Sequence, residues 1–347
     1  MTRRLLIDPN QPDPTLLAEA AAILQHGGLV AFPTETVYGL GANALDSAAV
    51  ERIFRAKERA RDDPLIVHLA STDDLPLVAE PPPPLAQHIA ARFWPGPLTL
   101  VLPRRATVPP IVTAGRPTVG VRVPSHPVAR GLLQAAHLPV AAPSANRFTR
   151  TSATRAEHVL DDLAGRVELI LDAGPTPVGI ESTVVAIEGE QVRILRPGAI
   201  PPEAIAEAIA PFGGTLAFGS RHPSEAPGQA PRHYAPRAAL TVFRGPPERA
   251  VAAALAQAQQ ELAAGRRVGA LLAAEDAPEA EQLGIVVERL GAREDLASIA
   301  HALFAALRRL DQAGVEVIVA PTFGEAGLGL ALLDRLTRAA EGRVVRV

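Results

Sequence analysis

The hydrophobic positions of residues 1–200 alternate between short, continuous apolar runs and longer stretches in which apolar residues recur every three or four positions. The short runs predict buried strands and the longer stretches predict helices with one apolar face. Expected strands are 29–32, 65–69, 98–102, 119–123, 169–171, 183–187 and 192–195. Expected helices are 14–26, 46–59, 85–93, 128–136, 156–163 and 202–210. This interleaving predicts an α/β fold with a twisted, mixed, open sheet.

The pattern resumes near residue 238 on a smaller scale, with expected strands at 240–243, 267–272, 285–288 and 315–319 and expected helices at 248–264, 296–313 and 328–340. Alternation of this kind predicts a small βαβ unit with a parallel sheet. Residues 221–236 contain four prolines, which favour a stiff, extended linker. We therefore expect a first domain at 1–205, a proline-rich linker or lid at 206–237 and a second domain at 238–347.

Composition excludes several classes of function. The 347 residues carry a net charge of −3, which argues against a protein that depends on bulk affinity for nucleic acid. The chain has no cysteine, which excludes disulfides, a thiolate nucleophile and cysteine-ligated zinc. Residues 1–13 lack the apolar core of a signal peptide, and no apolar run has the length of a membrane helix. We expect a cytoplasmic protein that does not contact a membrane.

Lys57 is the only lysine among 34 positively charged side chains, the rest of which are arginines. Arginine and lysine are not interchangeable, so this position suggests a need for a compact point charge. Arg52, Arg55, Arg59 and Arg61 surround it. The group is interpreted either as a phosphate-binding cluster after a helix or as a solvated helix face balanced by nearby carboxylates.

Arg122 is expected in the middle of a strand between two valines, where a charge needs a partner. The partner is either a substrate carboxylate, which an arginine binds with two parallel hydrogen bonds, or a structural ion pair. His68 closes an apolar strand, where a histidine is either structural or a ligand-binding group. Thr36 and Tyr38 are expected in a loop that leaves a short strand, where open α/β sheets bind ligands.

Five segments of the chain, taken in order, resemble the threonylcarbamoyl-AMP synthase family. They are Gly28-Leu-Val-Ala-Phe-Pro-Thr-Glu-Thr-Val-Tyr-Gly-Leu-Gly41, the stretch from Phe54 to His68 around Lys57, Phe93-Trp-Pro-Gly-Pro-Leu-Thr99, Val119-Gly-Val-Arg-Val-Pro124 and Ala142-Pro-Ser-Ala-Asn146. Later segments at 180–183 and 195–198 are also similar, and 232–236 resembles the linker of the long, two-domain form.

The resemblance implies a YrdC-like catalytic domain with a twisted mixed open sheet, followed by a smaller Rossmann-like parallel α/β domain. It implies that L-threonine, bicarbonate or CO2, and ATP give threonylcarbamoyl-AMP and pyrophosphate. This reaction starts the threonylcarbamoyladenosine modification of tRNA next to the anticodon. The implied cofactor is Mg²⁺ bound through the ATP phosphates. The implied partners are the downstream enzymes that transfer the threonylcarbamoyl group to tRNA, together with a weak contact with tRNA itself.

The resemblance also assigns residues. The catalytic residues it implies are Lys57 and Arg59. The residues it implies for threonine binding are Thr36, His68, Arg122, Ala142 and Ser182. The residues it implies for ATP binding are Lys57, Arg59, Asp63, Thr118, Ser144, Ser152, Arg196 and Tyr234. It implies no residue that ligates a metal directly.

The chain departs from the family pattern at Ala60, where the family has proline, and at Asp63, where it has asparagine. An anionic Asp63 would repel phosphate unless Arg59, Arg61 or Mg²⁺ neutralises it. The hydroxyls near residues 151–154 favour a phosphate cradle at a helix N-terminus, although helix capping by Thr154 explains them equally well.

Two other functions share this type of domain. An RNA-binding or ribosome-maturation role is disfavoured by the net charge and by an aromatic content of 3%. A carbamoyl transferase of the hydrogenase-maturation type carries cysteine-ligated zinc, which this chain cannot form.

Overall fold

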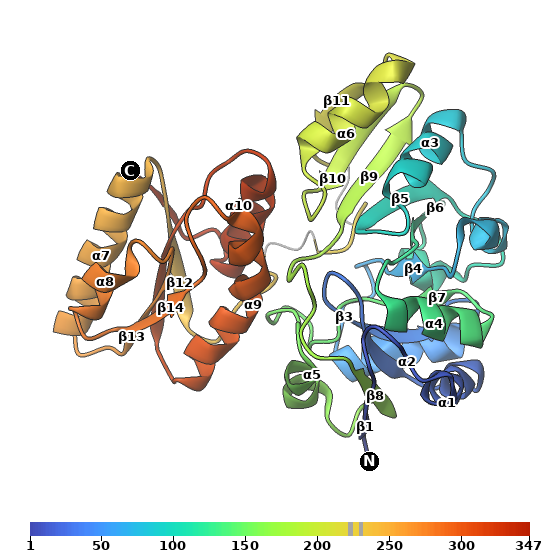
Figure 1. Ribbon diagram of the computed structural model, residues 1–347, viewed down its shortest axis with the longest axis horizontal. Coiled ribbons are helices and arrows are strands. Elements are labelled where there is room, and N and C mark those ends of the chain that lie inside the picture. Colours follow the sequence, from blue (N-terminus) through green and yellow to red (C-terminus); the bar gives the residue numbers. More distant parts are fainter. Residues whose placement is uncertain (221–224, 229–231) are drawn as a thin grey trace. The chain divides into compact units, whose positions relative to one another are not determined.

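The computed structural model describes residues 1–220, 225–228 and 232–347, which form two compact units (Figure 1). The first unit comprises Met1–Phe148, Ser152–Pro177 and Glu181–Gln229, and the second comprises Thr149–Thr151, Val178–Ile180 and Ala230–Val347. The range expected for the linker, 206–237, falls partly in each unit. Residues 221–224 and 229–231 of that linker lie outside the described residues.

The first unit contains an 11-stranded mixed sheet with the order β1-β8-β2-β3-β7-β4-β6-β5-β9-β10-β11. Its strands are β1 (Arg3–Leu6), β2 (Val30–Pro33), β3 (Tyr38–Asn43), β4 (Ile66–His68), β5 (Leu98–Pro103), β6 (Thr118–Arg122), β7 (Val140–Ala141), β8 (Leu169–Asp172), β9 (Thr183–Glu188), β10 (Gln191–Arg196) and β11 (Thr215–Phe218). Parallel and antiparallel neighbours are mixed: β4 pairs parallel with β6, whereas β5 pairs antiparallel with β6. This confirms the predicted sheet type.

The helices of the first unit begin and end close to the predicted limits. They are α1 (Pro14–Gln25), α2 (Ser47–Lys57), α3 (Pro84–Phe93), α4 (Pro127–Ala136), α5 (Ala156–Leu163) and α6 (Pro202–Ile209). The carboxylate of Asp46 accepts a hydrogen bond from the amide of Ala48 and caps α2. Thr154, in contrast, does not cap α5, which has Arg155 at its N-cap and no side-chain cap bond.

Both faces of the sheet are buried along its central strands, such as β2 and β4, which explains why these are continuous apolar runs rather than alternating ones. Along β2 and the residue before it, Leu29 and Ala31 contribute to one core cluster, whereas Val30 and Phe32 contribute to another. Helices α1 and α4 supply much of the second cluster, through Leu24 and other apolar residues. Packing on both faces therefore fixes the positions of these strands, and with them the residues at the strand ends.

Some strands were not predicted. Tyr38, which we expected in a loop, begins β3 and is fully buried, with its hydroxyl donating to the carbonyl of Gly174 at 2.7 Å. The glycines of β3 hide its strand character in the sequence. A Cβ on Gly41 would lie 2.8 Å from Phe32 and Val140, so close packing requires glycine there. Strand β11 lies within the range 206–237 that we expected to be linker.

The second unit contains a five-stranded sheet in which every pair is parallel, in the order β14-β13-β15-β12-β16. Its strands are β12 (Ala239–Arg244), β13 (Val268–Leu272), β14 (Val286–Arg289), β15 (Val317–Pro321) and β16 (Val344–Arg346), and its helices are α7 (Pro247–Ala263), α8 (Ala277–Glu281), α9 (Leu296–Gln312) and α10 (Leu328–Ala339). Helices cover both faces, with α7 and α8 opposite α9 and α10 (Figure 1). This confirms the predicted parallel α/β unit.

Within the described residues, no helix is both long enough and apolar enough to span a bilayer.

Candidate active site

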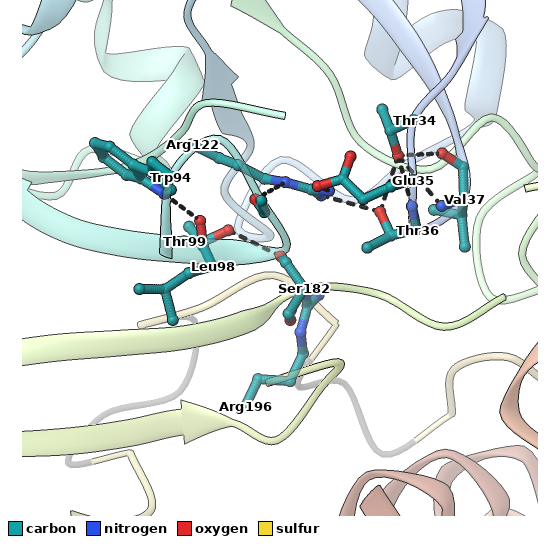
Figure 2. A network of polar contacts seen from close by, with 11 residues as sticks. Thr34, Glu35, Thr36, Val37, Trp94, Leu98, Thr99, Arg122, Ser182 and Arg196 are labelled. Atoms are coloured by element: carbon teal, nitrogen blue, oxygen red, sulfur yellow. Dashed lines mark hydrogen bonds and ion pairs between the residues drawn. The ribbon is translucent and has the colours of Figure 1, made fainter. Parts of the chain in front are cut away.

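A polar turn at residues 34–37 connects β2 to β3 and forms one wall of the candidate site (Figure 2). The Thr34 hydroxyl donates to the carbonyl of Val37 at 2.7 Å and lies 2.9 Å from the Thr36 hydroxyl. The two threonines therefore differ in role: Thr34 stabilises the turn, whereas Thr36 is directed toward β6. Both side chains are buried.

Arg122 ends β6 rather than lying in its middle, as we expected, and its guanidinium reaches the turn (Figure 2). Its Nη1 donates to the Thr36 hydroxyl at 3.0 Å, its Nε donates to the Gly96 carbonyl at 3.2 Å, and its Nη2 lies 2.7 Å from a carboxylate oxygen of Glu35. Burial works to raise the pKa of Glu35, but the charge and hydrogen bonding of Arg122 outweigh it, so this pKa lies below its ordinary value. The expected partner of Arg122 is thus partly supplied by the protein.

His68 ends β4 and is the register partner of Arg122 on β6. The ring is buried and packs edge-on against Phe32, with ring centroids 6.3 Å apart. Burial, assisted by the nearby charge of Arg122, lowers the pKa of His68 to about 3. The imidazole is therefore neutral at physiological pH and can hydrogen-bond to a ligand without adding charge.

Ser182 lies just before β9 and joins three elements (Figure 2). Its hydroxyl is 2.8 Å from that of Thr99 on β5, and the Arg196 guanidinium at the end of β10 donates to the Ser182 carbonyl at 2.8 Å. Gly198 permits this arrangement, because a Cβ there would lie 2.4 Å from the Ser182 backbone. Motifs at 180–183 and 195–198 are thus one structural unit.

Lys57 is 1% exposed, which rules out the solvated-face interpretation for this residue. It is the last residue of α2, and its Nζ donates to the carbonyls of Ser144 and Asn146. The neighbouring Ala142 amide donates to the carbonyl of Ile66 at 2.9 Å, which ties the same loop to β4. A buried ammonium therefore organises the loop that carries two predicted ligand contacts.

Arg59 is buried too, and its guanidinium pairs with the Asp63 carboxylate at 2.8 Å. This is one of the neutralising partners that we expected for Asp63. Arg55 and Arg61 do not join the cluster: their side chains are 77% and 70% exposed and both pair with Glu51. The expected cluster of five cations is therefore reduced to the buried pair of Lys57 and Arg59.

The remaining predicted nucleotide contacts are dispersed. Thr118 is the first residue of β6, not the residue before it, and is partly exposed. The Ser152 hydroxyl donates to the Glu181 carboxylate at 2.5 Å and is fully buried. Tyr234 belongs to the second unit, where its ring stacks on Phe304 with centroids 5.4 Å apart.

The first unit thus gathers a cluster of polar side chains and a cationic loop around the ends of β4, β6, β9 and β10. The cluster offers a guanidinium, a neutral imidazole and hydroxyls, which suit a small amino acid. The loop around Lys57 and Arg59 offers cations and backbone amides, which suit phosphates. This combination favours positioning and charge stabilisation over covalent catalysis.

Two family profiles match almost the whole chain. The profile described as "Telomere recombination" matches residues 22–198, and the profile described as "Threonylcarbamoyl-AMP synthase, C-terminal domain" matches residues 200–341.

Individual relatives match at full length. The threonylcarbamoyl-AMP synthase of Pyrococcus abyssi is 44% identical over 334 residues, covering 94% of this chain and 95% of that protein. The Bacillus subtilis threonylcarbamoyl-AMP synthase is 43% identical over 351 residues and is covered to 99%, as is this chain. The crystal structure of P. abyssi Sua5 complexed with L-threonine has a TM-score of 0.90 and 40% identity, covering 100% of this chain and 99% of that chain.

Fold, site and relatives define a two-domain α/β nucleotidyltransferase. The chain belongs to the threonylcarbamoyl-AMP synthase family, in its long form with a C-terminal domain. This confirms the family, the fold class and the activity predicted from the sequence. That activity is the ATP-dependent first step of tRNA threonylcarbamoyladenosine synthesis.

Glu35 was given no role from the sequence, although it pairs with Arg122 inside this cluster. A signal was present: it is a single charge between two threonines, flanked by the apolar runs at 29–33 and 37–40. A charge in such a position is costly unless it is paired or functional.

Proposed function

We propose that Thr36, His68, Arg122, Ala142 and Ser182 bind the threonine substrate. One observation carries this proposal: Arg122 and Thr36, which come from different elements, are joined by a 3.0 Å hydrogen bond between buried side chains. The remaining N–H groups of the Arg122 guanidinium suit the α-carboxylate of an amino acid. The solved complex of a P. abyssi relative with L-threonine supports the substrate class.

We propose further that ATP binds beside this pocket, through Lys57, Arg59, Asp63, Thr118, Ser144, Ser152, Arg196 and Tyr234. Lys57 and Arg59 act catalytically by stabilising charge as the α-phosphate is attacked and pyrophosphate leaves. The Arg59–Asp63 pair supports this arrangement, because it reduces the repulsion between Asp63 and phosphate. Asp63 then contributes by orienting Arg59 beside the nucleotide.

Mg²⁺ is proposed to arrive as part of the ATP substrate, held by phosphate oxygens. Among the described residues, no cluster of three or more His, Cys, Asp or Glu side chains is arranged to hold a metal ion. The ion would neutralise charge on the departing pyrophosphate.

The product is a mixed anhydride of a carbamate and a phosphate, which water destroys. We propose that enzymes that transfer the threonylcarbamoyl group to tRNA receive it, in the cytoplasm, with at most a weak contact between this chain and tRNA. The net charge of −3 supports a weak rather than a strong contact.

The assignment is tested by measuring pyrophosphate release from ATP while threonine, bicarbonate and Mg²⁺ are each omitted in turn. We expect release only when all are present. Equal turnover with serine, or without any amino acid, would contradict the proposed substrate pocket.

A further inference from the structure

Glu35 is a buried carboxylate in the pocket, and binding of threonine or ATP as proposed above gives it no task. It is 5% exposed, and its charged partner is the Arg122 guanidinium at 2.7 Å. Arg122 and the backbone amides of Glu35 and Ser125 lie close enough to lower its pKa, but none of them makes a well-aligned hydrogen bond to either oxygen. A carboxylate held in this way keeps hydrogen-bonding capacity that the fold does not fully use.

The hydrogen bonds of Arg122 indicate which substrate group the Glu35 carboxylate would contact. A guanidinium has five N–H groups, and Arg122 directs three of its nitrogens to Gly96, Thr36 and Glu35. One N–H on each terminal nitrogen remains for a substrate carboxylate. In an α-amino acid, the ammonium and the carboxylate are attached to the same carbon. Of the groups around Arg122, Glu35 is the one with the negative charge that suits the ammonium of a threonine whose carboxylate Arg122 holds.

We propose that Glu35 accepts the proton that the threonine ammonium must lose before its nitrogen can attack. This inference rests on the proposed threonine site. The balanced step takes the ammonium, bicarbonate and the Glu35 carboxylate to the carbamate, water and the Glu35 carboxylic acid. The nitrogen lone pair freed by this transfer forms the new C–N bond, and one C–O bond of bicarbonate breaks. The departing oxygen takes a second proton from the nitrogen and leaves as water. The proton returns to solvent before the next turnover.

The groups around Glu35 allow this role. Arg122 on β6, His68 on β4 and His126 before α4 are the titratable side chains that act on it. Burial lowers the pKa of both histidines, so they add little positive charge. Arg122 holds the pKa of Glu35 down in the free enzyme against the opposing effect of burial. When a substrate carboxylate shares Arg122, burial has more influence and Glu35 becomes a stronger base.

A simpler role would be to serve only as a counter-ion that orients Arg122. The two roles differ in their pH dependence. A lost counter-ion weakens threonine binding at every pH. A lost base matters only while the amine is protonated, because above the amine's pKa the neutral amine is available without it.

The test is the Glu35→Gln variant of the full-length protein, assayed for pyrophosphate release with saturating threonine, bicarbonate and MgATP between about pH 7 and pH 10. We expect turnover to fall about 100-fold at pH 7 and to recover to within about threefold of the wild-type rate near pH 10. Glu261→Gln is the matched control, because Glu261 is a buried, hydrogen-bonded carboxylate of the second unit. It should follow the wild-type profile at every pH.

A loss that is the same at all pH values, with a raised KM for threonine, would overturn the proposal in favour of the counter-ion. If Glu35→Gln does not fold, Glu35→Asp tests the same point. Its carboxylate is set back by one methylene, so we expect a smaller loss with the same recovery at high pH. Wild-type turnover that does not require threonine would contradict the proposed site itself, and the proposal about Glu35 with it.

Discussion

At the scale of single residues, Lys57 shows how a rare residue can mark a constrained position. Its ammonium lies among backbone carbonyls of residues 144 and 146, with 1% of the residue exposed. A planar guanidinium is larger and directs its N–H groups along fixed lines, so it cannot take the same place without moving that loop. The lysine therefore holds the loop in addition to the role at the phosphates that we propose for it.

Lys57→Arg should reduce turnover by at least about tenfold, which corresponds to about 1.4 kcal/mol of transition-state stabilisation. Pyrophosphate release measures this, with thermal unfolding as a check on the fold. Arg55→Lys is the control, because Arg55 lies on the same helix with a side chain that is 77% exposed. A near-normal rate for Lys57→Arg would show that position 57 requires only a positive charge, not a lysine.

Arg122→Ala should weaken threonine binding and also lower stability, because it leaves Glu35 buried without its partner. Breaking a buried pair by removing one member typically costs about 3–5 kcal/mol. Urea unfolding measures the stability and calorimetric titration measures threonine affinity. Adding Glu35→Gln should restore part of the stability but none of the affinity. If both are restored together, Arg122 has no direct contact with threonine.

The pKa of His68 predicts how stability responds to acid. This pKa is about 3 in the folded protein and close to 6.5 when the chain is unfolded. As the pH falls, the unfolded state binds a proton at a higher pH than the folded state does. The contribution of the neutral imidazole to the free energy of unfolding is therefore fully present above pH 6.5. It is lost as the pH falls from 6.5 toward 3, by up to about 1.4 kcal/mol per pH unit.

Urea unfolding of wild type and His68→Asn between about pH 4.5 and pH 7.5 tests this prediction. The variant should be less sensitive to pH than wild type over that range. Comparing the two proteins removes the contribution of His126, whose pKa is also lowered by burial. Parallel pH profiles would show that His68 is not the group that titrates.

At the scale of elements, the sequence predicted the strands and helices that have a strong apolar period. It failed where glycine or short length hides the period. Strand β3 contains two glycines because Phe32 and Ala142 pack against it, which only the folded sheet reveals. Strand β7 has two residues and is defined by its neighbours β3 and β4.

The site shows the same division. Arg122 was expected to need a partner because it is a charge in an apolar strand, whereas His68 was expected to be either structural or ligand-binding. The partner itself could not be predicted, since Glu35 and Arg122 are 87 positions apart and meet only through the order of β3, β7, β4 and β6. Exposure could not be predicted either: Arg55 and Arg59 look alike in the sequence, yet only Arg59 is buried.

Gly198→Ala should disrupt the close packing between the segment after β10 and the start of β9, which holds Ser182 in place. The added Cβ would lie 2.4–2.5 Å from backbone atoms of residues 181–183, which cannot move aside as a side chain could. We expect a large loss of turnover and of threonine affinity. Gly189→Ala is the control in the same hairpin: its φ is +62° with no atom within 4 Å of the new Cβ, so it should cost only about 1–2 kcal/mol of stability. Equal effects on activity would contradict this interpretation.

At the scale of the whole molecule, the catalytic unit is longer than the first 205 residues. Strand β11 pairs with β10, and the segment at 225–228 packs on the same unit. In that segment, the Pro227 carbonyl accepts a hydrogen bond from Arg196 at 3.1 Å, and the Gly228 amide donates to Asp63 at 3.3 Å. Two proposed nucleotide contacts therefore hold the chain that leads to the second unit.

Tyr234 lies six residues further on and is fully buried within the second unit, against Phe304 and Arg335. We propose that Tyr234 acts as a lid residue that helps to exclude water from the hydrolysis-prone carbamoyl-adenylate. A protein that ends after residue 228 keeps β11 and the 225–228 segment, whereas one that ends after Ile205 loses both.

We expect the protein ending at 228 to unfold at a higher temperature than the one ending at 205, and to be less active than the full chain. It should also release more free intermediate, and Tyr234→Ala in the full chain should reproduce part of this leak. Tyr234→Phe is the control, since it keeps the packing on Phe304. Pyrophosphate release and the lifetime of threonylcarbamoyl-AMP measure the two effects. If the protein ending at 228 matches the full chain in both, the second unit only tethers a partner and the lid is wrong.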